Sequence, residues 1–158
     1  MTAESILVLN GPNLNLLGAR EPEIYGTETL ADIEERIVQR ARELGCSVEL
    51  RQENDEGQLI EAVQSAPRRF AGIVCNPGAY AHYSYALADA ITAAGVPLVE
   101  VHISNTFARE DFRKTSVTAR AALGLVAGLG TKGYELALEA LVSHIRASHP
   151  GEPHLPDT

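Results

Sequence analysis

The chain is poor in cysteine and in positive charge, and it has no long apolar run. Its two cysteines, Cys46 and Cys75, have the spacing of neither a zinc site nor a redox pair, and Cys75 lies in an apolar run typical of a buried core. The formal charge of −8 disfavours nucleic acid and anionic membranes as partners, although a few arginines can still form a pocket for a small anion.

No apolar segment is long enough to span a bilayer, and no basic region precedes the short apolar run near the N-terminus. We therefore expect neither a membrane protein nor a secreted protein. Together with the few cysteines, this pattern predicts a cytoplasmic protein that works in a reducing compartment.

The amount of apolar sequence fits one folded domain. Hydrophobic residues make up 45% of the 158 residues, which excludes a disordered chain and is enough to form a core. The last segment differs, because it has three prolines and little apolar content. We predict a single catalytic domain over residues 1–147 and a disordered tail over residues 148–158.

Short apolar runs alternate with segments of helical periodicity. Strands are predicted at residues 6–9, 48–50, 71–75, 97–101 and 124–127. The first helix is predicted to begin at Thr27, as its N-cap, and to stop at Gly45. Further helices are predicted before Pro67, before Gly95 and over residues 134–145. Continuously apolar strands, each followed by a helix, indicate a parallel sheet covered on both faces, and therefore a three-layer α/β sandwich.

Ligands of such sheets bind beyond the carboxyl ends of the strands. Four segments fit that description, those that follow Asn10, Asn76, His102 and Gly128. The segment 128–133 also fits the dinucleotide pattern GxGxxG, but no second strand with an acidic residue comes after it. We interpret it as a glycine turn that lets the last helix pack closely on the sheet.

Two other α/β classes share this length and layout. A phosphoacceptor receiver domain needs acidic residues after the first and third strands, where this chain has Asn10 and Asn76, so that class is strongly disfavoured. A flavin carrier needs hydroxyl groups in the first loop for the phosphate, and residues 10–15 contain none. The flavin carrier is kept as an alternative hypothesis.

Glu100 and His102 stand two residues apart on a predicted strand and therefore share a face. Three interpretations fit this spacing. The pair could bind zinc with His82 as a third ligand, Glu100 could orient a catalytic imidazole without a metal, or the two could be a satisfied polar pair at a strand end. We favour the catalytic pair and keep a metal-dependent hydrolase as an alternative.

The segment from Asn10 to Gly26 is the strongest candidate for part of an active site. Its first half has three asparagines in six residues, and neutral amides suit substrate hydroxyls and a developing oxyanion. Its second half begins at Gly18 and ends at Gly26, so we predict a loop that can open and close as a lid.

Arg20 and Tyr25 lie within this predicted lid. A free tyrosine has a pKa of about 10, so a catalytic phenolate at neutral pH requires about 4 kcal/mol of stabilisation. A guanidinium group at close range in a water-poor site can supply that energy, and Arg20 is the nearest candidate in the sequence.

Several motifs of one known family occur together and in the family's order. They are NGPNLNLLG at 10–18, REP at 20–22, IYG at 24–26, NPGA at 76–79, EVHISN at 100–105, RE at 109–110, FR at 112–113, GLG at 128–130 and GY at 133–134. Through these motifs the chain resembles the type II dehydroquinases, the type II 3-dehydroquinate dehydratases. The resemblance implies a flavodoxin-like fold with a five-stranded parallel sheet of order 2-1-3-4-5, assembled as a homododecamer built from trimers.

The resemblance also implies a reaction, the reversible dehydration of 3-dehydroquinate to 3-dehydroshikimate through an enolate, without a metal or cofactor. An enolate route needs no lysine nucleophile, which suits a chain whose only lysines are Lys114 and Lys132. The same reaction serves the shikimate pathway to chorismate and the aromatic amino acids, or the breakdown of quinate, and the resemblance does not choose between them.

The acid–base residues implied by the resemblance come from four of these motifs. Tyr25 matches the base that removes the proton next to the ketone, and Arg20 matches the cation that promotes phenolate formation. Asn13 matches the residue that helps to hold a water on the enolate oxygen. His102 matches the acid that protonates the departing hydroxyl, and Glu100 matches the carboxylate that orients it.

The substrate-binding residues implied by the resemblance are more widely spread. The backbone of Ile103 and the hydroxyl of Ser104 match the site for the substrate carboxylate. Asn76, His82 and Arg113 match groups that hold the substrate hydroxyls.

Asp89 matches a residue that reaches the site from a neighbouring subunit, so the resemblance implies an active site that depends on assembly. Three positions depart from the usual pattern of the family: Tyr83 replaces a threonine, Phe107 a histidine and Lys132 a glutamine. None of the three belongs to the acid–base motifs.

Overall fold

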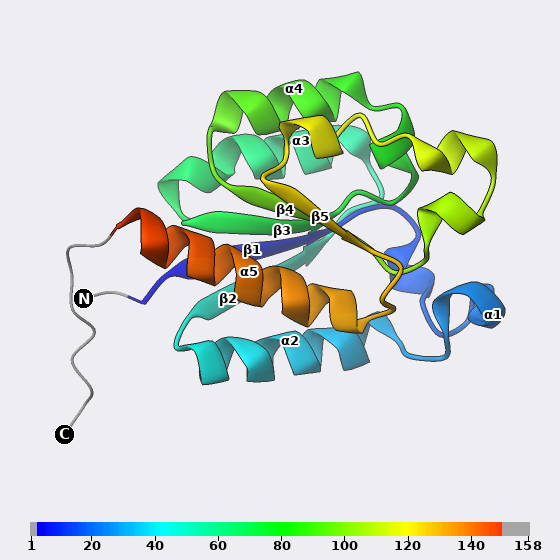
Figure 1. Cartoon of the computed structure of the whole chain (residues 1–158), viewed down its shortest axis with the longest axis horizontal. Coiled ribbons are helices and arrows are strands. Elements are labelled where there is room, and N and C mark those ends of the chain that lie inside the picture. The colour runs from blue at the N-terminus through cyan, green and yellow to red at the C-terminus, as the bar shows by residue number, and fades with distance from the viewer. Residues whose placement is uncertain (1–2, 150–158) are drawn as a thin grey trace.

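The computed structural model describes residues 3–149, and its centre is a five-stranded sheet in which every pairing is parallel (Figure 1). Across the sheet the strands are β2 (Ser47–Gln52), β1 (Ser5–Asn10), β3 (Gly72–Asn76), β4 (Leu98–His102) and β5 (Gly124–Ala127). This order, 2-1-3-4-5, confirms the predicted flavodoxin-like sheet.

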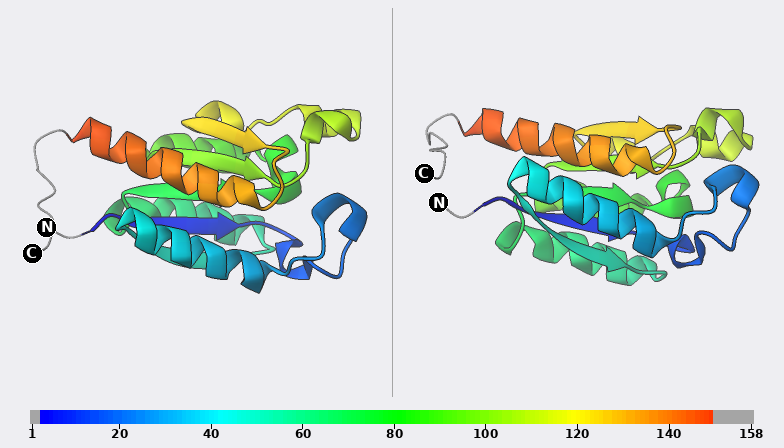
Figure 2. Two further views of the ribbon diagram at one scale, coloured as in Figure 1. Left: turned by 60° about the horizontal axis from the view of Figure 1, so that its bottom comes forward. Right: turned by 90° about the horizontal axis from the view of Figure 1, so that it is seen from below.

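Two pairs of helices cover the sheet, one pair on each face, which confirms the predicted three-layer sandwich (Figures 1 and 2). One pair consists of α2 (Leu30–Leu44) and α5 (Lys132–Ser148), and the other of α3 (Glu56–Ser65) and α4 (Tyr85–Ala94). Within residues 3–149, no helix has both the length and the apolar character needed to cross a membrane.

The central strand β1 contributes to both layers of the core. Ile6 and Val8 pack in the cluster with α2 and α5, whereas Leu7 and Leu9 pack in the cluster with α3 and α4. Successive side chains of a strand point to opposite faces, so a strand between two helical layers must be apolar at every position. The continuous apolar runs of the sequence reflect this burial.

Helix α2 begins two residues later than predicted. Its N-cap is Thr29 rather than Thr27, because the Thr29 hydroxyl accepts from the backbone N–H of Asp32 while the Asp32 carboxylate accepts from the Thr29 N–H. This reciprocal capping box requires an acidic residue three positions after the cap, and Thr27 has none. The helix ends at Gly45, as predicted, with φ of 71°.

The predicted lid contains a short helix. Residues 22–25 form α1 (Pro22–Tyr25), which lies beyond the carboxyl edge of the sheet and precedes Gly26, whose φ is 81° (Figure 1). Short 3-10 helices lie nearby at Leu14–Leu16, Gly78–His82, Thr106–Ala108 and Asp111–Lys114, whereas the one at Ala119–Ala121 packs against α4. The edge that carries the predicted site is therefore built from tight turns.

The boundary between the predicted domain and tail falls at the end of α5. This helix runs to Ser148, the first residue of the predicted tail, and His149 follows it. Residues 150–158 lie outside the described part of the chain. The division into a domain over 1–147 and a tail over 148–158 stays a prediction.

Candidate active site

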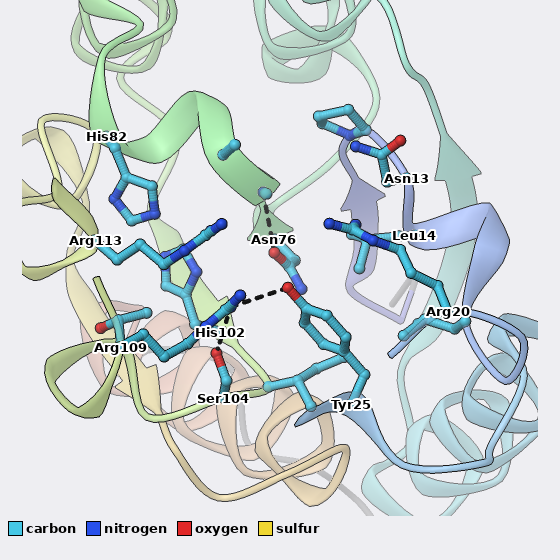
Figure 3. A pocket seen from close by; sticks show the side chains of 16 residues that line it. Asn13, Leu14, Arg20, Tyr25, Asn76, His82, His102, Ser104, Arg109 and Arg113 are labelled. Atoms are coloured by element: carbon cyan, nitrogen blue, oxygen red, sulfur yellow. Dashed lines mark hydrogen bonds between the residues drawn. The ribbon is translucent and has the colours of Figure 1, made fainter. Parts of the chain in front are cut away.

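A pocket opens at the carboxyl edge of the sheet, between the segments that follow β1, β3 and β4 (Figure 3). The predicted site residues that line it are Asn13, Arg20, Tyr25, Asn76, His82, His102, Ile103, Ser104 and Arg113. Glu100 and Asp89 do not line it. Three of the four predicted segments thus meet, whereas the segment after Gly128 contributes no lining residue and instead supports β4 through a bond from Gly128 N–H to the His102 carbonyl.

The phenol of Tyr25 points into this pocket from the end of α1 and is bound by an arginine from the other side (Figure 3). Arg109 Nη1 donates to Tyr25 Oη at 2.9 Å and lies 3.1 Å from Ser104 Oγ. The centre of the Arg20 guanidinium lies 5.4 Å from the Tyr25 ring centroid, and its Nε is 3.2 Å from Glu21 Oε2. The cation in contact with the phenolic oxygen is therefore Arg109.

Arg109 had no role in the sequence-based set of site residues. The sequence nevertheless gave an indication of a role for Arg109. This residue follows the polar end of β4, five residues after Ser104, and belongs to one of the family motifs. Sequence proximity favoured Arg20, which is close to Tyr25 along the chain. The fold instead brings Arg109 to the phenol across 84 residues.

Glu100 and His102 form the predicted pair, with Glu100 completely buried beneath the pocket. Glu100 Oε2 is 3.0 Å from His102 Nε2 and 2.7 Å from Ser116 Oγ, and its Oε1 accepts from Thr118. Burial by itself would raise the pKa of the Glu100 carboxyl, but the His102 ring and the two hydroxyls outweigh burial and hold that pKa below its usual value.

His82 lies beside His102 in the pocket (Figure 3). The two rings are stacked, with centroids 6.0 Å apart, and His82 Nδ1 is 2.8 Å from the carbonyl oxygen of Thr115. Burial lowers the pKa of His82, although the bond to Thr115 acts in the opposite direction. A neutral imidazole suits a group that binds hydroxyls.

The three asparagines after β1 do not act as one cluster. Asn10 is fully buried and accepts from the Tyr134 hydroxyl at 2.6 Å, and Tyr134 in turn accepts from Asn76 at 3.0 Å. Asn13 and Asn15 are both exposed, and of the two only Asn13 lines the pocket. The interpretation of the cluster as a set of substrate-facing amides was wrong for Asn10, because its amide connects β1 to α5.

The backbone around Asn13 is shaped for its position. Asn13 has φ of 68°, a left-handed conformation that asparagine tolerates better than most residues, and its N–H donates to the Asn54 side chain at 3.0 Å.

On the opposite wall, the Arg113 guanidinium forms an ion pair with Glu110 while it lines the pocket.

The geometry around Glu100 and His102 does not match the alternative in which these two residues and His82 bind a metal. His102 Nε2 is directed at Glu100, and both Glu100 oxygens already accept hydrogen bonds from protein groups. Among the residues that the structure describes, no three histidine, cysteine, aspartate or glutamate side chains are grouped in a way that could hold a metal ion. Cys46 and Cys75 are both buried and unpaired.

A flavodoxin-like sheet with a tyrosine, a carboxylate–imidazole pair and several arginines around a pocket at its carboxyl edge is typical of an enzyme. Comparison with known sequences identifies which one, because the sequence model described as "Dehydroquinase class II" matches residues 4–142. The chain belongs to the class II dehydroquinase family.

Individual relatives agree with this assignment. A 3-dehydroquinate dehydratase of Halalkalibacterium halodurans is 53% identical over 139 residues, which cover 88% of this chain and 96% of the relative. A "3-dehydroquinate dehydratase 1" of Agrobacterium fabrum is 56% identical over 136 residues, which cover 86% and 94%. The crystal structure of a type II dehydroquinase from Propionibacterium acnes matches with a TM-score of 0.86 at 48% identity, over 90% of this chain and 98% of that one.

Proposed function

We propose that the protein catalyses the reversible dehydration of 3-dehydroquinate to 3-dehydroshikimate through an enolate, with Tyr25 as the base and His102 as the acid. The proposal depends above all on one observation: a single pocket holds a tyrosine whose oxygen is bound to a guanidinium, and an imidazole backed by a buried carboxylate. An elimination needs one group of each kind. We take 3-dehydroquinate as the substrate because the chain belongs to the class II dehydroquinase family.

In the first step Tyr25, as phenolate, takes a proton from the carbon next to the ketone, and the electron pair moves onto the carbonyl oxygen. The bond from Arg109 to the phenolic oxygen supports this role, because it holds that oxygen in the pocket beside a positive charge. Arg20, whose guanidinium lies near the face of the same ring, adds a second positive charge. The enolate oxygen is stabilised through a water held by Asn13.

In the second step the enolate re-forms the ketone, the carbon–oxygen bond at the β-carbon breaks, and His102 gives its proton to the departing hydroxyl, which leaves as water. Glu100 orients the His102 ring through its contact with Nε2. The reverse reaction uses the same groups with their protonation states exchanged.

The remaining residues of the pocket bind the substrate. We assign the carboxylate to the backbone of Ile103 and the hydroxyl of Ser104, and the substrate hydroxyls to Asn76, His82 and Arg113. Their common position in the lining supports this assignment. The bond from Arg109 to Ser104 joins the carboxylate site to the base, so substrate binding and proton removal share one residue.

We further propose that the protein works as a homo-oligomer, a dodecamer built from trimers, in which Asp89 of a neighbouring subunit completes each site. Asp89 is exposed on α4 and does not reach the pocket of its own chain. The edge of the sheet is also exposed and apolar, since Leu123 and Leu125 beside and within β5 are 47% and 44% exposed. Association would cover this edge.

The direct test is to incubate the purified protein with 3-dehydroquinate and to follow the absorbance of the conjugated enone product. Turnover that survives exhaustive chelation, in a preparation without bound chromophore, would support the proposal and exclude the metal hydrolase and the flavin carrier. Borohydride added during turnover should trap no covalent adduct. Folded protein that gives no turnover would refute the proposed function.

A further inference from the structure

We propose that the segment 115–118, named here the brace, sets the tautomers of both pocket histidines, and that Ser116 and Thr118 are positioning residues for the acid His102. The inference rests on the proposed function, in which His102 is the acid. None of the four brace residues lines the pocket, and the brace lies between two short 3-10 helices, outside the predicted site motifs.

The first contact of the brace is with His82. The Thr115 carbonyl oxygen is 2.8 Å from His82 Nδ1. A carbonyl oxygen can only accept a hydrogen bond, so this contact requires the proton on Nδ1. In the neutral ring Nε2 is then the acceptor. His82 is thereby prepared to accept a hydrogen bond from a substrate hydroxyl.

The second contact is with Glu100, the partner of His102. Ser116 donates to one carboxylate oxygen at 2.7 Å and Thr118 donates to the other. The direction of the Ser116 hydroxyl is fixed from behind, because its oxygen accepts from the backbone N–H of Ala119 at 3.0 Å. The same oxygen lies 3.2 Å from Thr118 Oγ1, so the bond to Glu100 is the shorter of the two that its hydrogen can make.

These donors decide where the pair keeps its proton. An ionised carboxylate can accept from Ser116, Thr118 and His102 at once, whereas a protonated Glu100 has to use one oxygen as a donor and loses at least one of these bonds. Hydrogen bonds to a charged group are stronger than those between neutral groups. The brace thus keeps Glu100 ionised and the Nε2–H of His102 directed at it, so the proton that His102 gives as the acid is a second one, carried on Nδ1 toward the pocket.

The brace is itself held in place, which allows it to act on both rings. Val117 N–H donates to the Ala81 carbonyl at 2.8 Å, next to His82, and Thr118 is fully buried. The brace is thereby fixed to the turn after β3 through Ala81 and to β4 through Glu100. The two histidines, which stack on each other, share this support.

The test compares Thr118→Val, which keeps the branched shape and removes the hydroxyl, with the matched control Thr118→Ser, which keeps the hydroxyl. Ser116→Ala, at a half-buried position, is a second deletion that should fold even if Thr118→Val does not. The readouts are kcat and KM for 3-dehydroquinate, and nitrogen chemical shifts of protein labelled with 15N-histidine, with the His102 signals identified from a His102→Gln sample.

We expect each deletion to lower kcat about tenfold or more, to leave KM within about twofold, and to leave Nε2 of His102 unprotonated in a measurable fraction of the protein. Thr118→Ser should restore both kcat and the wild-type signals. Equal defects in Thr118→Val and Thr118→Ser would mean that Thr118 acts by packing, and unchanged His102 signals in both deletions would overturn the proposal. The spectra do not depend on turnover, so an inactive wild-type protein would refute the proposed function separately.

Discussion

The phenolic oxygen of Tyr25 contacts Arg109, and the proposed role of Tyr25 as the base depends on this oxygen. Replacing Tyr25 by Phe removes the one oxygen that Arg109 contacts on α1 and should leave the packing of the half-buried ring intact. We expect kcat to fall by about 10²–10⁴-fold, the usual contribution of a general base. Product absorbance measures the loss, and circular dichroism with gel filtration checks that fold and assembly are kept. A rate within tenfold of wild type would show that Tyr25 is not the base.

Arg109 and Arg20 can be separated by the same assay. Arg109→Met keeps the length of the side chain but removes every donor to Tyr25 and Ser104, so we expect kcat to fall about 10- to 100-fold and KM to rise. Arg109→Lys keeps the charge and should recover part of kcat. Arg20→Met, which leaves the contact from Arg109 in place, provides the comparison. If only the Arg20 variant were impaired, the contact between Arg109 and Tyr25 would have no catalytic role.

Individual residues also show which contacts of the site could be predicted from the sequence and which could not. Glu100 and His102 were paired correctly because the alternation of a strand places residues two apart on one face. Arg109, Ser116 and Thr118 were not found, because contacts across loops depend on how two turns fold against each other. No periodicity in the chain encodes such contacts.

The turns that follow β1 and β3 touch each other directly, and Gly11 makes this contact possible. A Cβ at Gly11 would lie 2.6 Å from the carbonyl oxygen and 2.7 Å from the carbonyl carbon of Pro77, and both are backbone atoms that cannot move aside as a side chain would. The Gly11 N–H also donates to the Asn76 carbonyl at 2.7 Å. The relative position of Asn13 and Asn76 therefore depends on this glycine.

Gly11→Ala should cost about 1–3 kcal/mol of stability, as overpacking does, and should raise KM because the two turns separate. The matched control is Gly124→Ala in β5, where an added Cβ meets no atom within 4 Å. Urea unfolding and steady-state kinetics of the two variants measure the difference. Equal stability of the two variants would contradict the close approach of the turns.

The regular elements were largely predictable, since their signals are local. Burial on both faces makes the strands apolar throughout, and Gly45 and Gly95 end α2 and α4 because both adopt positive φ. The short helix α1 was missed, since four residues show no periodicity. The contact of Asn10 with α5 was missed too, because its partner, Tyr134, is 124 residues away.

For the molecule as a whole, the single chain holds both the proposed base and the proposed acid, yet Asp89 does not line the pocket of its own chain. Asp89 is exposed on α4, whereas the pocket of the same chain is lined from the segments after β1, β3 and β4. If Asp89 acts, it acts on a neighbouring subunit. Each active site would then combine Tyr25 of one chain with Asp89 of another.

Mixed oligomers test this sharing directly. Tyr25→Phe and Asp89→Ala chains, each of low activity alone, are co-expressed so that they assemble together. Random assembly should place a native Tyr25 opposite a native Asp89 in about a quarter of the sites, so activity should return to about that fraction of wild type. Mixing the separately assembled variants is the control and should restore little. Co-assembled protein that is no more active than the average of its two parents would show that Asp89 serves no neighbouring site.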